Sequence, residues 1–239
     1  MTSIRLEVCV EDAAGLAAAI TAGADRIELC SALALGGLTP SPGLIAIAAR
    51  APVPVRAMIR PRAGSFVFTP DEVSQMLADI EAVKMAGLAG VVLGANTADG
   101  RLDTAVLATL RAAARPLAAT LHRAFDLVPD PLEALETAIQ LGFDRILTSG
   151  LARTAPEGTD MLAALVERAA GRIGILPGSG ISVETVEAIL SRVDVNEVHA
   201  SCSTALREQA QAVALGFTPA ERRVTDGQTV RALKAKLAR

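Results

Sequence analysis

The chain has 239 residues, 51% of them apolar, and a formal net charge of −3. Its basic residues are scattered and it has no Trp or Tyr to stack on bases, which argues against a nucleic-acid partner. No run approaches the roughly 20 apolar residues of a membrane-spanning helix, and residues 1–6 lack an export signal. Three cysteines cannot all pair, which favours a reducing cytoplasm.

Short β-rich runs alternate with longer helical stretches along the chain, the pattern of parallel βα units. Most of these runs are apolar on both faces, as expected for a sheet that is covered on both sides. We predict eight strands, at residues 4–10, 25–30, 53–61, 90–96, 117–126, 145–150, 172–177 and 197–201.

Helices between the strands are marked by their end signals. Thr69-Pro70-Asp71-Glu72 is typical of an N-cap, a proline in the first turn and a capping-box glutamate, and Asp130-Pro131-Leu132-Glu133 repeats the pattern. Glycines that favour a left-handed cap precede the next strand at Gly23, Gly87 and Gly142. After Ala205 we predict a closing helix, an exposed turn at 225–227 and a short amphipathic helix at 230–237.

These elements predict one α/β domain over residues 1–239, a (β/α)₈ TIM barrel at about 4–204 with a C-terminal extension at 205–239. A doubly wound sheet also alternates strands and helices, but about eight repeats without a charged edge strand favour closure. Barrels place their working sites at the C-terminal ends of the strands. We therefore expect the functional residues there.

Charged side chains on strands buried on both faces require partners. Glu7 and Cys9 share one face of the first strand, and Glu28 and Cys30 share one face of the second. A buried carboxylate is costly unless it is paired, and Arg60 and Arg62 at the end of the third strand are candidate partners. A purely structural layer of ion pairs is the alternative.

The only two histidines, His122 and His199, lie near the ends of the fifth and eighth strands. Alternation would place Asp126 on the face of His122 and Ser201 on the face of His199. Histidine titrates near neutral pH, so the pair is a candidate for acid–base chemistry.

A glycine-rich turn follows the seventh strand, in a region where barrels often bind phosphate on backbone N–H groups. The alternative is a plain turn with a helix cap. Two loops, 36–41 and 62–66, are candidate lids, although surface turns are the default. The predicted anion-binding residues are Arg62, Arg123, Ser149, Gly178, Ser179, Gly180 and Ser201.

Several motifs together resemble the CutC copper-homeostasis family, over about strand one to strand eight. They are Leu6-Glu7-Val8-Cys9-Val10, Gly23-Ala24-Asp25-Arg26-Ile27-Glu28-Leu29-Cys30, Gly36-Gly37-Leu38-Thr39-Pro40-Ser41, Met58-Ile59-Arg60-Pro61-Arg62, Leu121-His122-Arg123-Ala124-Phe125-Asp126 and Leu147-Thr148-Ser149-Gly150. The resemblance implies a cytoplasmic barrel, often a homodimer, that is linked to copper handling. It does not supply a reaction.

Two hypotheses follow for the function. In the first, soft cysteine ligands hold copper(I), with Cys9, Cys30 and Cys202 as candidates. In the second, an enzyme acts on a small phosphate or carboxylate metabolite. There Arg60, with Arg62 or Arg123, fixes the anion, Glu7 or Glu28 is the base, and His122 or His199 is the acid. The sequence leaves open which hypothesis holds, and whether the protein is an enzyme.

Overall fold

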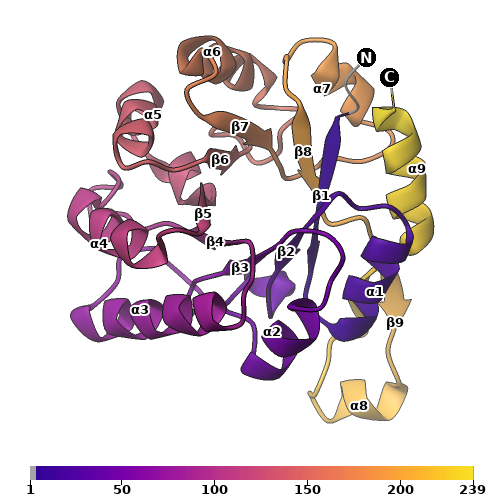
Figure 1. Cartoon of the computed structure of the whole chain (residues 1–239). Coiled ribbons are helices and arrows are strands. Elements are labelled where there is room, and N and C mark those ends of the chain that lie inside the picture. The colour runs from indigo at the N-terminus through magenta and orange to yellow at the C-terminus, as the bar shows by residue number, and fades with distance from the viewer. Residues whose placement is uncertain (1–3, 239) are drawn as a thin grey trace.

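The computed structural model describes residues 4–238, and its centre is a nearly closed barrel of eight parallel strands (Figure 1). The strands follow one another in the order β7-β6-β5-β4-β3-β2-β1-β8, and β8 packs beside β7 at the seam. Helices surround this barrel, which confirms the predicted TIM-barrel fold.

All eight predicted strands are present, each somewhat shorter at one or both ends than its apolar run. They are β1 (Arg5–Val10), β2 (Arg26–Leu29), β3 (Val55–Met58), β4 (Gly90–Leu93), β5 (Ala118–Leu121), β6 (Arg145–Thr148), β7 (Gly174–Pro177) and β8 (Glu197–Ala200). The register sets Glu7 of β1 between Arg26 of β2 and His199 of β8. Side chains that alternate along these three strands therefore meet inside the barrel.

Among residues 4–238, eight helices pack around the barrel. They are α1 (Ala13–Thr21), α2 (Pro42–Ala48), α3 (Pro70–Met85), α4 (Thr104–Ala114), α5 (Pro131–Gln140), α6 (Thr159–Ala169), α7 (Val186–Leu190) and α9 (Gly227–Leu237). Thr69 and Glu72 form the predicted capping box of α3, and the Asp130 carboxylate accepts two backbone N–H groups of α5. Each such cap supplies partners that a helix start lacks within itself.

Two predictions are wrong, one at the end of the fifth strand and one in the C-terminal extension. Strand β5 stops at Leu121, and residues Arg123–Leu127 form a 3₁₀ turn, so Asp126 does not share the face of His122. After Ala205 the chain forms an antiparallel hairpin with a short helix between its strands, instead of the predicted closing helix. It consists of β9 (Ser203–Arg207), α8 (Ala210–Ala214) and β10 (Glu221–Thr225), residues 203–225, which we call the arm.

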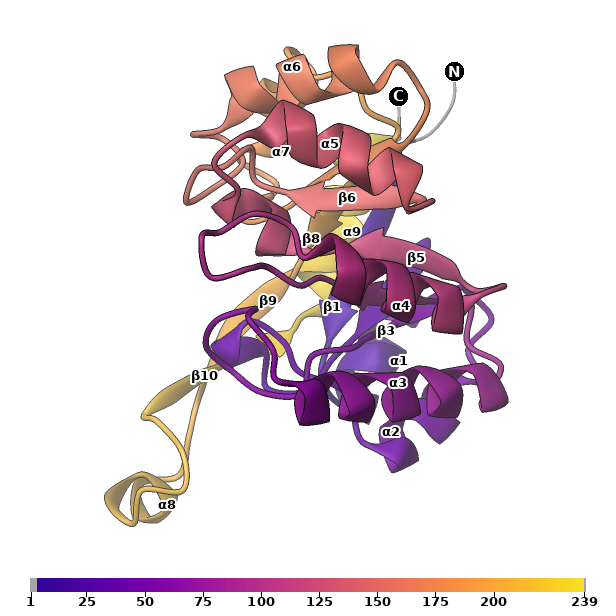
Figure 2. The same cartoon turned by 90° about the vertical axis from the view of Figure 1, so that its left-hand side faces the viewer.

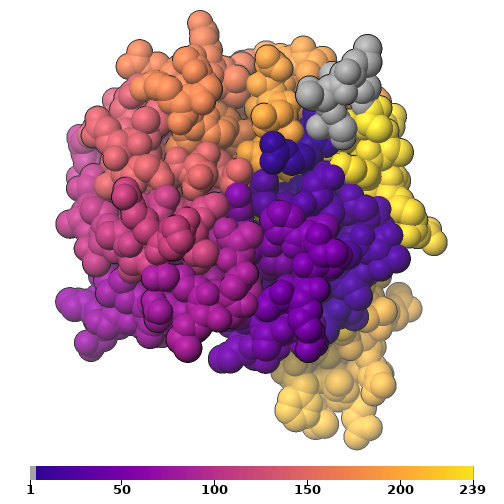
Figure 3. All heavy atoms as spheres, in the orientation of Figure 1, coloured from indigo at the N-terminus to yellow at the C-terminus, as the bar shows by residue number. Residues whose placement is uncertain are grey.

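The arm projects from the barrel, whereas α9 returns to it (Figures 2 and 3). Val230, Leu233 and Leu237 of α9 are buried, and the helix packs against β1 and α1. The extension thus supplies the eighth outer helix. Among residues 4–238, no helix is long and apolar enough to cross a membrane.

Candidate metal centre and its cavity

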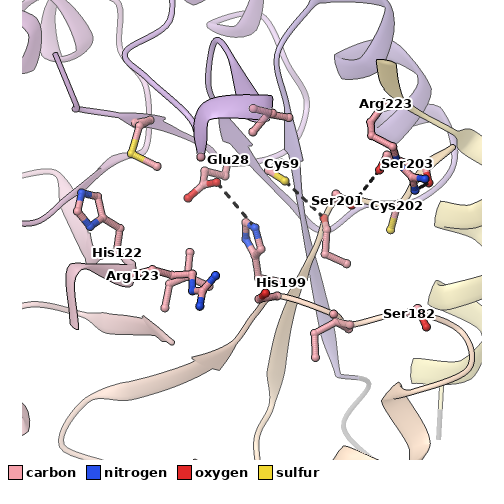
Figure 4. Close-up of a pocket in the computed structure, with 18 of the residues that line it drawn as sticks. Cys9, Glu28, His122, Arg123, Ser182, His199, Ser201, Cys202, Ser203 and Arg223 are labelled. Carbon is pink, nitrogen blue, oxygen red and sulfur yellow. Dashed lines mark hydrogen bonds and ion pairs between the residues drawn. The ribbon is translucent and has the colours of Figure 1, made fainter. Parts of the chain in front are cut away.

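A cavity of about 490 Å³ opens where the strands end, the place that the barrel fold predicts for a site. Cys9, Glu28 and His199 lie on one side of it, and His122 and Arg60 also line it (Figure 4). Strands β1, β2 and β8 are neighbours in the sheet, so the first three side chains converge there.

Cys9, Glu28 and His199 form what we call the metal-ligand cluster. One ligand atom from each, a thiol sulfur, a carboxylate oxygen and an imidazole nitrogen, lies within 4.8 Å of the other two. All three residues are buried. Such a set of sulfur, nitrogen and oxygen donors is able to surround a single metal ion.

The Glu7 carboxylate orients the imidazole ring of His199. The Glu7 carboxylate lies 2.9 Å from Nδ1 of His199 and also pairs with the Arg26 guanidinium. Nε2 of His199 then faces Glu28, 3.8 Å away. Metal-binding histidines are commonly oriented in this way, by a carboxylate on the nitrogen that does not bind the metal.

The cluster is strongly coupled electrostatically. Burial alone would raise the pKa of Glu7, but the hydrogen bond with His199 and the charge of Arg26 lower it to about 2. Burial would lower the pKa of His199, yet the Glu28 carboxylate and further neighbours raise it well above its ordinary value. Burial also raises the pKa of Glu28. Glu7 is therefore a permanent counter-charge and is a poor candidate for the base.

The other two cysteines lie outside the metal-ligand cluster. Cys30 is buried with Met58 and Val92 and donates a weak hydrogen bond to Glu28, 3.5 Å away. Cys202 lines the cavity but lies apart from the Glu28–His199 pair (Figure 4). Burial raises the pKa of both thiols, that of Cys202 to about 12.

The His122 imidazole is neutral and presents an N–H group as a hydrogen-bond donor. Burial and the nearby charge of Arg60 lower its pKa to about 3. Nδ1 accepts the backbone N–H of Ala124, so the ring proton is on Nε2. A buried, neutral imidazole of this kind can donate a hydrogen bond from Nε2, which differs from the acid role predicted for His122.

Arg60 is largely committed to loop backbone. Its guanidinium donates to the carbonyl oxygens of Leu35, Gly37 and Gly64, at 2.9, 3.1 and 2.9 Å. These contacts fix both loops that the sequence predicted as lids. Arg60 does not pair with Glu7 or Glu28, whose partners are Arg26 and His199.

The predicted anion-binding residues are only partly brought together. Arg123, Ser179, Gly180 and Ser201 line the cavity. Arg62 is instead paired with Glu72 at the start of α3, outside the cavity, so it is misplaced in the prediction.

The predicted anion-binding residues near β6 and β7 also make contacts that an anion site would not require. Asp126 pairs with Arg123 at 2.6 Å and accepts the Ser149 hydroxyl at 3.0 Å, so both groups are already engaged. Gly178 is required for close packing, because a Cβ there would lie 2.5 Å from Leu147. Helix α7 begins only at Val186 and is too short and distant to present its N-terminus to a phosphate.

Sequence reasoning missed the charged layer beneath the site. Arg26 lies between Glu7 and Glu197, and Arg145 pairs with Glu197 at 2.9 Å. Arg26 precedes Glu28 by two residues, and Glu197 precedes His199 by two. The alternation that revealed the site residues therefore contained the signal for this layer as well.

Comparisons with known proteins agree with this fold. The CutC family model matches residues 4–204. A CutC-family protein of Rhizobium meliloti (strain 1021) is 58% identical over 238 residues, 99% of this chain and 97% of that protein. One from Vibrio campbellii is 50% identical, over 84% of this chain and 82% of that protein.

Among solved structures, a candidate copper homeostasis protein CutC from Streptococcus agalactiae superposes with a TM-score of 0.80. The two sequences are 34% identical, and the superposition covers 83% of this chain and 98% of that chain. A phosphoribosylanthranilate isomerase from Pyrococcus furiosus has a TM-score of 0.59 at 13% identity, which indicates a shared fold alone.

Proposed function

Since the chain belongs to the CutC family, we propose that it takes part in copper homeostasis by holding one Cu(I) ion at the metal-ligand cluster. The observation that carries this proposal is the convergence of Cys9, Glu28 and His199 within 4.8 Å. A solved relative is described as a candidate copper homeostasis protein.

The donor set fits copper(I). The Cys9 thiolate and a neutral imidazole are ligands that this soft ion accepts, whereas the Glu28 carboxylate is harder and contributes mainly charge. Binding would require His199 to release a proton from Nε2, while Glu7 keeps Nδ1–H in a hydrogen bond. Copper is here the cargo of the protein.

A Cu(I) titration of the reduced protein against a competing chelator tests the proposal. We expect one ion per chain, and X-ray absorption should give one sulfur ligand together with nitrogen or oxygen, because only Cys9 of the cysteines belongs to the cluster. A first shell of two or more sulfurs, or failure to retain copper against the chelator, would contradict it.

We also propose a cytoplasmic homodimer joined through the arm. The cysteines are free, which suits a reducing compartment. Helix α8 buries none of its residues, and Leu215 and Phe217 are 63% and 82% exposed. A two-stranded hairpin is marginal on its own, so such an arm needs a covering partner.

A second copy of the chain is the partner that the charges of the arm favour. The arm carries three arginines and two glutamates, at Arg207, Glu208, Glu221, Arg222 and Arg223. This near-neutral mixture allows two arms to meet around a twofold axis without repulsion.

Light scattering after gel filtration tests this dimer. We expect a dimer for the wild type and a monomer for Leu215→Ser/Phe217→Ser, since the double change removes the two most exposed large apolar side chains of the arm. Met85→Ser is the control, because Met85 is also 82% exposed but lies on α3. A wild-type monomer, or a double variant that stays dimeric, would rule the arm out.

A further inference from the structure

His122 and Arg60 line the same cavity, and each carries a buried donor without an acceptor. Among residues 4–238, neither Nε2 of His122 nor Nε of Arg60 has a hydrogen-bond partner. The two side chains belong to residues only 3% and 5% exposed. A buried donor left unpaired costs about 1–3 kcal/mol, so such groups in native proteins call for an explanation.

The charges around Arg60 indicate which kind of acceptor is missing. Within the described part of the chain, no carboxylate pairs with Arg60, while the neighbouring Arg62 is neutralised by Glu72 and Arg123 by Asp126. Arg60 thus brings one uncompensated positive charge into the cavity wall. A buried charge is normally balanced by an opposite one.

We propose that the cavity binds a small organic monocarboxylate through His122 Nε2–H and Arg60. The single charge of a carboxylate matches Arg60, the buried arginine of the cavity lining that lacks an ion-pair partner among the described residues, and its two oxygens match the two donors. A phosphate would need further donors, yet the Ser179 hydroxyl already donates to Arg153. This site does not depend on copper, because its residues lie outside the metal-ligand cluster.

Apolar neighbours indicate that the carboxylate carries a hydrocarbon body. Leu33, Met58, Leu147 and Ile181 line the same cavity. Phe66 lies over both donor residues, with its ring 4.7 Å from that of His122 and 4.9 Å from the Arg60 guanidinium carbon. This aromatic cover limits access of water and strengthens the attraction between Arg60 and an anion.

Imidazole NMR of the metal-free protein tests the proposal directly. With only two histidines, the Nε2–H signal of His122 is assignable. We expect butyrate and hexanoate to shift that signal saturably, and their neutral amides to bind at least about tenfold more weakly because they lack the charge. Equal binding of acids and amides, or no shift of the His122 signal with either acid, would overturn it.

A matched pair of variants separates the donor from the fold. His122→Asn keeps an oxygen for the backbone N–H of Ala124 but removes the Nε2 donor, whereas His122→Gln can place an amide N–H near the Nε2 position. We expect butyrate affinity to fall about tenfold or more in His122→Asn and to be largely retained in His122→Gln. Wild-type affinity in a folded His122→Asn would contradict the role of His122. Because copper is absent, this outcome is separate from that of the copper titration.

Discussion

Replacing Arg26 with methionine is expected to lower the free energy of unfolding by about 3–5 kcal/mol. Arg26 is 3% exposed and lies between two carboxylates, those of Glu7 and Glu197, which are 1% and 4% exposed. Methionine fills similar space but leaves both carboxylates short of a partner inside the barrel. Removing one member of a buried ion pair is costly because the desolvated charge remains. Urea unfolding followed by circular dichroism measures the change.

Two further variants make the Arg26 result interpretable. Arg172→Met removes an arginine that pairs with Glu136 on the surface, where the arginine side chain is 43% exposed, and it should leave the stability close to that of the wild type. Arg26→Lys keeps the charge but not the planar fork that reaches two carboxylates, so an intermediate loss is expected. An Arg26→Met protein as stable as the surface control would show that the layer does not stabilise the barrel.

Much of the fold could be predicted from the sequence because the local signals for strands and helix starts agree with the elements of the barrel. The apolar runs located every strand of the barrel, and Thr69 and Asp130 begin helices as their side chains predict. The wrong predictions concern features that depend on residues far apart in the sequence. The arm depends on pairing between Leu206 and Arg222, sixteen positions apart, which no local pattern in 205–225 indicates. Asp126 leaves the strand because its carboxylate accepts groups of the β6 loop.

The sequence indicated which side chains point into the barrel, but not which of them converge or pair: of the predicted ligands Cys9, Cys30 and Cys202, only Cys9 lies in the cluster. Alternation placed Glu7, Cys9 and Glu28 inside the barrel, and strand ends placed His199 beside them. Which arginine meets which carboxylate depends on register and side-chain length, so Arg26 and not Arg60 is the partner of Glu7. Arg60 reaches the loop carbonyls instead, and this leaves its Nε unpartnered in the cavity.

Cys9→Ser is expected to weaken Cu(I) binding by about 100-fold or more. Cys9 is the only thiol of the metal-ligand cluster, and a serine hydroxyl of nearly the same shape is a hard, poor ligand for copper(I). Changes to groups that merely orient a ligand already cost about 10–100-fold in metal affinity, so loss of a direct ligand should cost at least as much. Competition with a chelator measures the dissociation constant.

The other two cysteines provide the matched controls for this variant. Cys202→Ser makes the same atomic change in the same cavity, outside the cluster, and should bind copper as the wild type does. Cys30→Ser alters only a group 3.5 Å from the Glu28 carboxylate, so its effect should lie between the two. The order Cys9, Cys30, Cys202 in decreasing effect is expected because Cys9 belongs to the cluster, Cys30 contacts its Glu28 carboxylate and Cys202 lies outside it. If Cys202→Ser were the most damaging change, the ion would have to lie on the side of the cavity nearer α9, and the cluster of Cys9, Glu28 and His199 would not be the copper site.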